Sequence, residues 1–201
     1  MRNLIRFTVL LIFAAFVTAT TSNAQARGKE NFEDTVDEYF KLLTSKDLPI
    51  LDKYKNRASI IKEADYKNRY LLLANEEWKG WGEMAVFSKT DGGHLIVVTQ
   101  YDCKQKYPSY PYYSRSNCAG NIRFLTLEKN ALVEAKNLMP DLKSLQLYGF
   151  YEKKTKRLAD SDDKLMFELP RERKDILIKL AGETVYSLLW NGQKFEGSYV
   201  D

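Results

Sequence analysis

The chain has 201 residues, of which 44% are hydrophobic and 29% are charged, with 31 basic and 27 acidic side chains. This composition is ordinary for a globular protein and argues against a disordered chain. Residues 1–26 carry Arg2 and Arg6 and no acidic residue, so their removal lowers the formal net charge from +4 to +2. Such a near-balance argues against a general nucleic-acid-binding protein, which usually carries a strong basic excess.

The first 26 residues have the pattern of a signal peptide. Arg2 and Arg6 precede an apolar run from Phe7 to Val17, and Ala24-Gln25-Ala26 fits the small-x-small cleavage pattern. The run is too short for a membrane span, and no second apolar stretch follows it. We therefore expect cleavage after Ala26, one exported domain at residues 27–201, and no stable membrane insertion after cleavage. The expected location is the periplasm or the medium.

From Asn31 onward, the apolar residues recur at helical spacing, with acidic residues on the opposite side; the apolar residues are Phe32, Val36, Tyr39, Phe40 and Leu43. This spacing predicts an amphipathic helix that packs its apolar stripe on a sheet. Leu48-Pro49 ends or kinks that helix.

The rest of the chain is mainly typical of β-strands, because apolar residues alternate or form short runs between turn residues. The expected strands are residues 69–74, 81–87, 94–101, 122–128, 131–135, 148–151, 165–169, 176–180, 185–190 and 195–199. Asn191-Gly192 predicts a hairpin with a type I′ turn. The expected fold class is therefore α+β, with an N-terminal amphipathic helix packed on antiparallel β-hairpins. Phe124–Ala135 and Tyr186–Gly197 share a similar pattern, which leaves open whether they are two related hairpin units.

The chain contains two cysteines, Cys103 and Cys118. In an oxidising compartment, an even pair at this spacing predicts one disulfide. A reactive-thiol or metal-binding role is the alternative interpretation, but neither cysteine has a histidine next to it in the sequence.

Three segments carry a resemblance to known proteins: Asn68–Leu71, Asp91–Val98 and Leu188–Glu196. Together they resemble a group of exported bacterial proteins, common in Bacteroidetes-type organisms, that have no assigned activity. The resemblance implies export and a β-rich fold. It implies no active site, because the shared motifs belong to strands and turns.

Catalytic and metal-binding patterns are weak in this sequence. The chain has one histidine, His94, and it contains no nucleophile elbow, zinc-protease motif or phosphate-binding loop. Asp160-Ser161-Asp162-Asp163 lacks the spacing of a calcium-binding loop. We therefore expect a non-catalytic protein with no cofactor and no metal site.

The segment between the two cysteines is the strongest candidate for a binding surface. It combines two prolines and three cations with four tyrosines, and its candidate contact residues are Tyr107, Tyr110, Tyr112, Tyr113 and Arg115. Tyrosine offers a large, rigid contact area, and the disulfide would order the loop. Trp78 and Trp81 are candidates for an aromatic platform beside it. The alternative interpretation is that these rings only pack against the sheet.

These observations predict an exported binding or interaction protein whose partner is a cell-envelope glycan or another protein. Three other functions stay open, namely an inhibitor of a secreted hydrolase, a hydrolase, which would need a convergent acidic cleft, and a structural component of the envelope. An inhibitor would show tight one-to-one protein binding, whereas a structural component would assemble without a small ligand.

Overall fold

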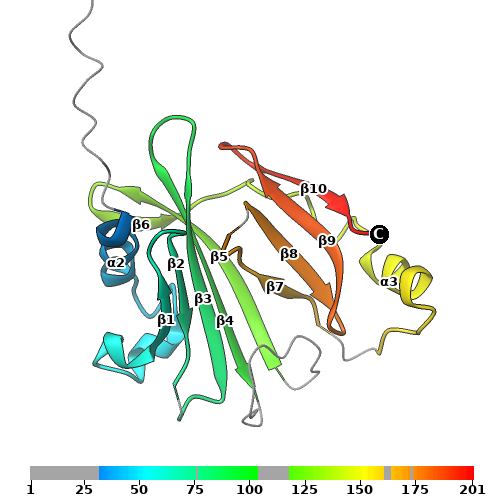
Figure 1. Cartoon of the computed structure of the whole chain (residues 1–201), viewed down its shortest axis with the longest axis horizontal. Coiled ribbons are helices and arrows are strands. Elements are labelled where there is room, and N and C mark those ends of the chain that lie inside the picture. The colour runs from blue at the N-terminus through cyan, green and yellow to red at the C-terminus, as the bar shows by residue number, and fades with distance from the viewer. Residues whose placement is uncertain (1–31, 76, 104–117, 161–163, 173) are drawn as a thin grey trace, which may run out of the picture. The chain divides into compact units, whose positions relative to one another are not determined.

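Two antiparallel sheets form most of the computed structural model, which describes residues 32–75, 77–103, 118–160, 164–172 and 174–201 (Figure 1). The elements are α2 (Phe32–Leu42), η1 (Pro49–Asp52), η2 (Arg57–Ile60), β1 (Ile61–Asp65), β2 (Tyr70–Leu73), β3 (Gly80–Ser88), β4 (His94–Cys103), β5 (Cys118–Glu128), β6 (Ala131–Glu134), α3 (Leu147–Thr155), β7 (Met166–Glu168), β8 (Asp175–Leu180), β9 (Glu183–Trp190) and β10 (Phe195–Tyr199). Sheet A has the order β1-β2-β3-β4-β5-β6, and sheet B has the order β10-β9-β8-β7. The expected signal peptide, residues 1–26, lies outside the described residues.

The expected α+β fold class is wrong, because the described residues are mostly antiparallel β-sheet. The described residues form two antiparallel sheets and only two short α-helices, α2 with 11 residues and α3 with 9 residues. One core cluster joins apolar residues of both sheets, so the two sheets are packed against each other. The hairpins β5–β6 and β9–β10 belong to different sheets, and each lies at a sheet edge.

Sheet A is buried on both faces at its centre. One face packs against α2, η1 and η2, through Val36, Phe40, Ile50, Ile60, Leu71, Met84, Ile96 and Val98. The other face packs against sheet B, through Leu72, Ala85, Phe87, Val97, Ile178, Leu188, Trp190 and Phe195. Strands buried on two faces are apolar at consecutive positions, which explains the run Leu95–Val98 in β4.

Sheet B is buried mainly on one face. Along β8, Ile176, Ile178 and Leu180 are buried and alternate with half-buried residues. In β9, Leu188 is buried, whereas its neighbour Leu189 is 51% exposed. This period of two is what a half-buried antiparallel strand requires.

The hairpin at Asn191-Gly192 is present, but its predicted turn type is wrong. Trp190 pairs with Phe195, so the loop has four residues, and Gly192 alone among them has a positive φ. The Asn191 side-chain oxygen accepts hydrogen bonds from the backbone N–H groups of Gln193 and Lys194, and these bonds stabilise the longer loop. Two-residue turns with positive φ at both positions occur instead at Lys129-Asn130 and Ala181-Gly182.

Residues 148–151 form part of helix α3, so the strand predicted there is wrong. The Phe150 N–H donates to the Gln146 carbonyl, a helical bond, and Lys156 ends the helix in the left-handed conformation. In the part of the chain that the structure describes, no helix is long and apolar enough to cross a membrane.

Candidate functional site

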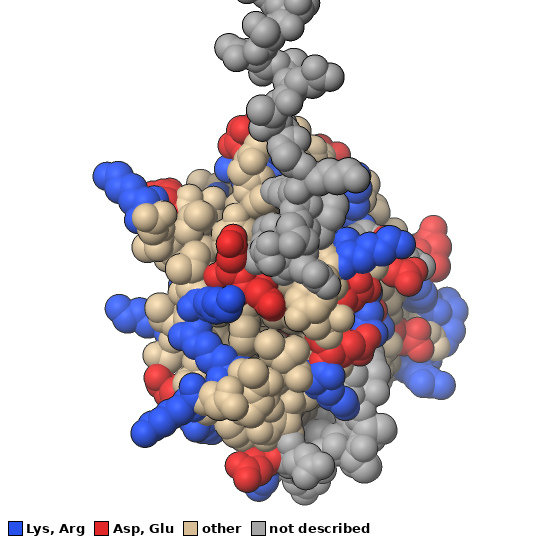
Figure 2. Space-filling view, turned by 60° about the vertical axis from the view of Figure 1, so that its left-hand side comes forward, with Lys and Arg blue, Asp and Glu red and all other residues tan. Residues whose placement is uncertain are grey.

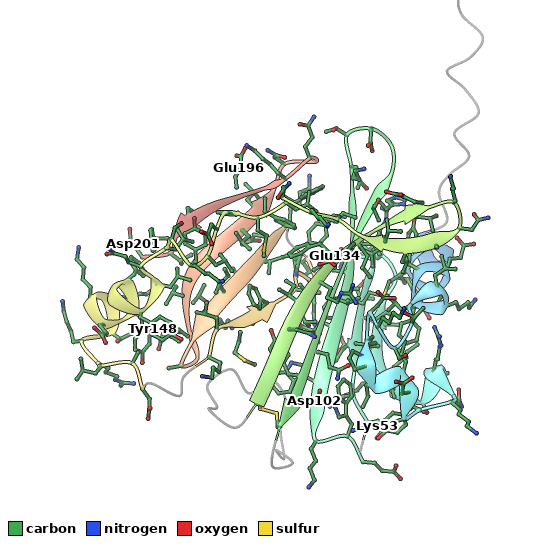
Figure 3. All side chains as sticks on the ribbon, turned by 180° about the vertical axis from the view of Figure 1, so that it is seen from behind. Lys53, Asp102, Glu134, Tyr148, Glu196 and Asp201 are labelled. Carbon is green, nitrogen blue, oxygen red and sulfur yellow. A yellow bond between two sulfur atoms is a disulfide. The ribbon has the colours of Figure 1, made fainter. Side chains whose placement is uncertain are left out.

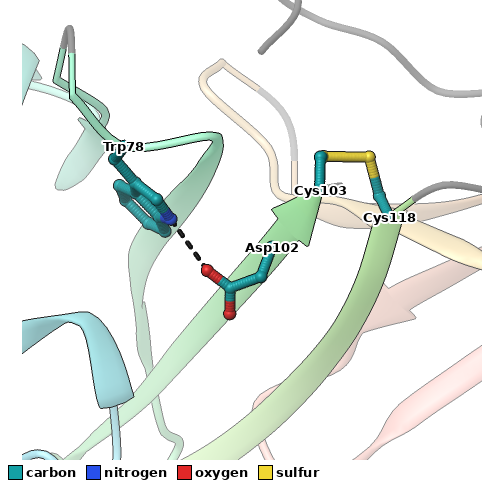
Figure 4. Close-up of a disulfide and its surroundings, with 4 residues drawn as sticks. All are labelled: Trp78, Asp102, Cys103 and Cys118. Atoms are coloured by element: carbon teal, nitrogen blue, oxygen red, sulfur yellow. Dashed lines mark hydrogen bonds between the residues drawn. A yellow bond between two sulfur atoms is a disulfide. The ribbon is translucent and has the colours of Figure 1, made fainter. Parts of the chain in front are cut away.

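The predicted disulfide is present at one end of sheet A. Cys103 ends β4 and Cys118 begins β5, and the two residues are direct partners in the sheet (Figure 4). The predicted contact residues Tyr107, Tyr110, Tyr112, Tyr113 and Arg115 lie outside the described residues. The site predicted from the sequence can therefore be described only at its base.

Trp78 is buried beside this base, with 5% of its surface exposed. Its ring N–H donates a hydrogen bond of 2.8 Å to the Asp102 carboxylate (Figure 4). The same carboxylate accepts from the Gln100 side-chain amide at 2.6 Å, and the Gln100 oxygen accepts from the Ile50 N–H at 2.9 Å. Trp78 thus connects the helical side of the molecule to the end of β4.

Trp81 is 4% exposed and packs on the other face of sheet A. Its ring stacks on Tyr101 with a centroid distance of 5.0 Å, in a small cluster that includes Cys118 and Met166. Trp78 belongs to the cluster on the helical side. The two tryptophans therefore do not form one exposed platform, and both contribute to packing.

A cavity of about 470 Å³ opens between the two sheets, at the end where β3 leads into β4. Its lining comes from four separate segments, with residues Lys67, Asn68, Arg69, Ala85, Val86, Phe87, Ser88, Lys89, Thr90, Pro170, Lys174, Trp190, Asn191 and Gly192. This volume lies within the range of roughly 300–1,000 Å³ that is typical of small-molecule sites.

Hydrogen bonds between the sheets and within sheet B fix the walls of this cavity. The Trp190 ring N–H donates to the Ser88 carbonyl at 2.8 Å, and the Thr90 N–H donates to the Gly192 carbonyl at 3.0 Å. The Trp190 backbone N–H donates to the Lys174 carbonyl at 3.1 Å. Because each bond joins two lining residues, the cavity has a defined shape before any ligand enters.

The lining is positively charged. It contains Lys67, Arg69, Lys89 and Lys174, and none of the described lining residues is acidic. Arg69 is 6% exposed and donates to the Ser88 hydroxyl at 3.0 Å, so its guanidinium lies at the wall and not in solvent. Cations gathered in a concave, partly apolar site raise the local concentration of anions.

Two aspartates lie next to the cavity, one in each flanking turn. Asp65 accepts hydrogen bonds from the Asn68 side chain and backbone, and these bonds, together with nearby charges, lower the pKa of Asp65. The Gly93 N–H and the Lys89 ammonium lower the pKa of Asp91. Lys89 pairs with Asp91 at 2.9 Å, whereas Lys67 and Lys174 form no salt bridge with a carboxylate of the described residues.

The one histidine of the chain, His94, does not line this cavity, although its strand partner Ser88 does. The His94 Nδ1 is 2.9 Å from the hydroxyl of Tyr39, and neither residue lines the cavity. Within the described ranges, no group of three His, Cys, Asp or Glu side chains is placed to hold a metal ion.

The sequence pattern gave no indication of this cavity. Its basic residues are distributed between positions 67 and 174, and each alone is typical of a solvated turn. The expected hairpin at Asn191-Gly192 does contribute to it, but no local pattern shows that Thr90 and Gly192 meet. The cavity arises only where the two sheets pack together, and no local sequence pattern encodes that packing.

No protein-family model matches the chain, and no curated protein matches it. Among solved structures, the chain is similar to a domain of an uncharacterized protein from Porphyromonas gingivalis W83, with 14% sequence identity and a TM-score of 0.42. The match covers 81% of this chain and 98% of that domain. This is a distant structural neighbour, and the similarity is too low to support an inference about function.

Proposed function

We propose that this chain is an exported, non-catalytic binding protein and that its ligand places an acidic group in the cavity between the sheets. One observation carries the proposal: four basic side chains and no acidic side chain line the described part of a cavity of about 470 Å³. The Cys103–Cys118 disulfide supports an oxidising compartment. An acidic glycan of the cell envelope has the required chemistry.

The cavity favours a ligand that has both a charge and an apolar body. Phe87, Trp190 and Pro170 supply apolar surface, and the basic side chains supply charge. Most neutral polar groups of the lining already bond within the protein: Ser88 accepts from Arg69, and the Asn191 amide bonds to Gln193, Lys194 and Glu196. Recognition would therefore depend mainly on charge, which a carboxylate, a phosphate or a sulfate would satisfy.

The non-catalytic part of the proposal depends on the position of the one histidine. Nδ1 of His94 bonds to Tyr39 outside the cavity, so His94 is not placed to act as a general base on a ligand held there.

The test is an NMR titration of protein expressed from the full chain, with D-glucuronate, inorganic phosphate and inorganic sulfate as separate probes and glucose as the neutral control. We expect the acidic probes to shift the backbone amides of Ser88, Thr90 and Gly192, and glucose to shift none of them. Affinity should fall as salt increases, because the attraction is largely electrostatic.

A pair of matched variants separates the cavity from general surface charge. Lys67→Gln/Lys174→Gln removes two lysines of the lining, and Lys53→Gln/Lys55→Gln removes two exposed lysines that do not line it. Lys53 is at the opposite end of the molecule from Glu196, which is on the hairpin beside the cavity (Figure 3). The face shown in Figure 2 carries both basic and acidic side chains.

The cavity variant should weaken binding of the acidic probes by roughly fivefold per lysine, if each contact contributes about 1 kcal/mol. The control variant should bind as the wild type does. Equal losses in both variants, or binding of glucose as strong as that of glucuronate, would contradict the proposed function.

A further inference from the structure

Strand β7 is at an edge of sheet B, and the two sides of its backbone are bonded differently. On one side it pairs with β8, with Phe167 opposite Ile178. On the other side, side chains from sheet A take the place of a strand. The groups involved are the side chains of Glu83 and Tyr101 and the backbone of Phe167 and Leu169, which we call the β7 clamp.

Tyr101 bonds to both backbone groups of one β7 residue. Its hydroxyl accepts from the Phe167 N–H at 2.6 Å and lies 3.2 Å from the Phe167 carbonyl, to which it donates. Burial raises the pKa of the Tyr101 phenol far above its usual value, and the Glu83 carboxylate raises it further, against the effect of the Phe167 N–H. The hydroxyl therefore keeps the proton that it donates.

Glu83 holds the chain two residues further on. It is 2% exposed, and its carboxylate accepts from the Leu169 N–H at 3.0 Å and from the Tyr70 hydroxyl at 2.8 Å. An ionised carboxylate has only acceptors, so it can join donors that come from two different elements. Among the apolar neighbours of β3, a carboxylate is costly unless such donors satisfy it.

The clamped segment continues directly into the cavity wall. Pro170 follows Leu169 and lines the cavity. Arg171 then pairs with Glu63 of β1 at 2.6 Å, and its guanidinium lies 5.1 Å from the centre of the Tyr70 ring. Apolar packing is not directional, so alone it would not set where residues 167–171 lie along sheet A. These hydrogen bonds do set it, because each one holds a particular backbone group.

We infer that Glu83 and Tyr101 are positioning residues of the cavity: they hold residues 167–171 against sheet A and thereby set the place of Pro170 in the cavity wall. The part of this inference that concerns binding depends on the proposed function, whereas the part that concerns the wall does not. Neither residue touches the cavity, since neither is among its lining residues.

The test uses Tyr101→Phe, which removes only the hydroxyl, and Glu83→Leu, which removes both acceptor oxygens at a similar side-chain volume. Ile96→Val is the matched control, because Ile96 is fully buried on the helical side of sheet A and its truncation lowers stability without touching the clamp. Amide hydrogen exchange of Phe167, Leu169 and Arg171 is measured first, without any ligand. Affinity for D-glucuronate and inorganic phosphate is measured second.

We expect exchange at Phe167 in Tyr101→Phe, and at Leu169 in Glu83→Leu, to become about tenfold faster than in the control, as loss of one such bond implies. Amide exchange at Arg171 should also become faster in both variants. Affinity for the acidic probes should fall severalfold in both variants and remain unchanged in Ile96→Val.

Unchanged exchange at these amides would overturn the inference. Faster exchange with unchanged affinity would also overturn it, because the wall would then move without effect on the ligand. If the wild type binds no acidic probe, the proposed function fails, and the exchange data alone decide whether the clamp holds the wall.

Discussion

The disulfide end and the cavity end of the molecule both contain aromatic residues, but they use them differently. At the disulfide end, Trp78 and Trp81 are buried on opposite faces of sheet A, and the Trp78 N–H bonds to Asp102 of the same chain. At the cavity end, the ring N–H of Trp190 bonds to the Ser88 carbonyl in the cavity wall. The side chains of Lys67 and Lys174 line the same cavity and remain exposed. Aromatic residues thus indicate packing at both ends, and the cavity end carries the basic lining on which the proposed function rests.

The largest expected effect comes from Trp81→Ala. The Trp81 ring is 4% exposed and stacks on Tyr101, so its removal should lower the free energy of unfolding by about 3–5 kcal/mol. Urea denaturation measures this loss. Affinity of the folded protein for glucuronate should change much less than stability does; a loss of affinity with unchanged stability would show that Trp81 contacts a ligand.

Removal of the disulfide should have a slightly smaller effect. Cys103→Ser/Cys118→Ser opens a loop with a sequence separation of 15, and this should cost roughly 3 kcal/mol of unfolding free energy in the chain-entropy model. Cavity binding should persist, because none of the lining residues lies between the cysteines. Thermal denaturation with and without reductant checks the first point, and the NMR titration checks the second.

Gly192→Ala tests the frame of the cavity. Gly192 has a φ of +97°, and a Cβ atom placed there would lie 2.5 Å from Cγ2 of Thr90. We expect a loss of about 1–3 kcal/mol from backbone strain and crowding. Gly149→Ala is the control: Gly149 lies in α3 with open space around it, so alanine there should be neutral or stabilising by up to about 1 kcal/mol. Equal unfolding midpoints for the two variants would contradict the strained turn.

The smallest expected effect concerns the turn that carries Asn68. The pKa of Asp65 is lowered mainly by the hydrogen bond from the Asn68 side chain. A lowered pKa means that this bond stabilises the folded state above about pH 4, and that the stabilisation is lost as the pH falls through the lowered value. Asn68→Ala should therefore raise the pKa of Asp65, which carbon-detected NMR titration measures. Lys67→Gln should raise it less, because the charge of Lys67 is a smaller cause.

Much of the strand pattern could be predicted from the sequence, because burial imposes a short period. The alternation in residues 81–87 and 176–180 matches β3 and β8, and the run after His94 matches β4. Strand β1 was missed because Lys62, Glu63 and Asp65 give it no apolar face typical of a buried strand. Helix α3 was missed because Tyr148–Tyr151 is too short and too aromatic to show a helical period.

The candidate site could not be predicted in the same way, because it depends on contacts between segments far apart in the sequence. Asn191-Gly192 indicates a hairpin, but the backbone bonds to the Asn191 side chain set its four-residue loop. The meeting of Thr90 with Gly192, 102 residues away, follows from the packing of the two sheets. Glu83 in the middle of β3 is a local sign of such a contact, since a buried carboxylate needs hydrogen-bond donors from other elements.

The β7 clamp also has a consequence for self-association. An unpaired strand edge is a template on which an extended segment of a second molecule can add, and such addition leads to aggregates. In β7, both the N–H and the C=O of Phe167 are already bonded to Tyr101. A second molecule therefore finds no open hydrogen-bonding groups at Phe167, so a single phenol protects this edge of sheet B from intermolecular strand addition.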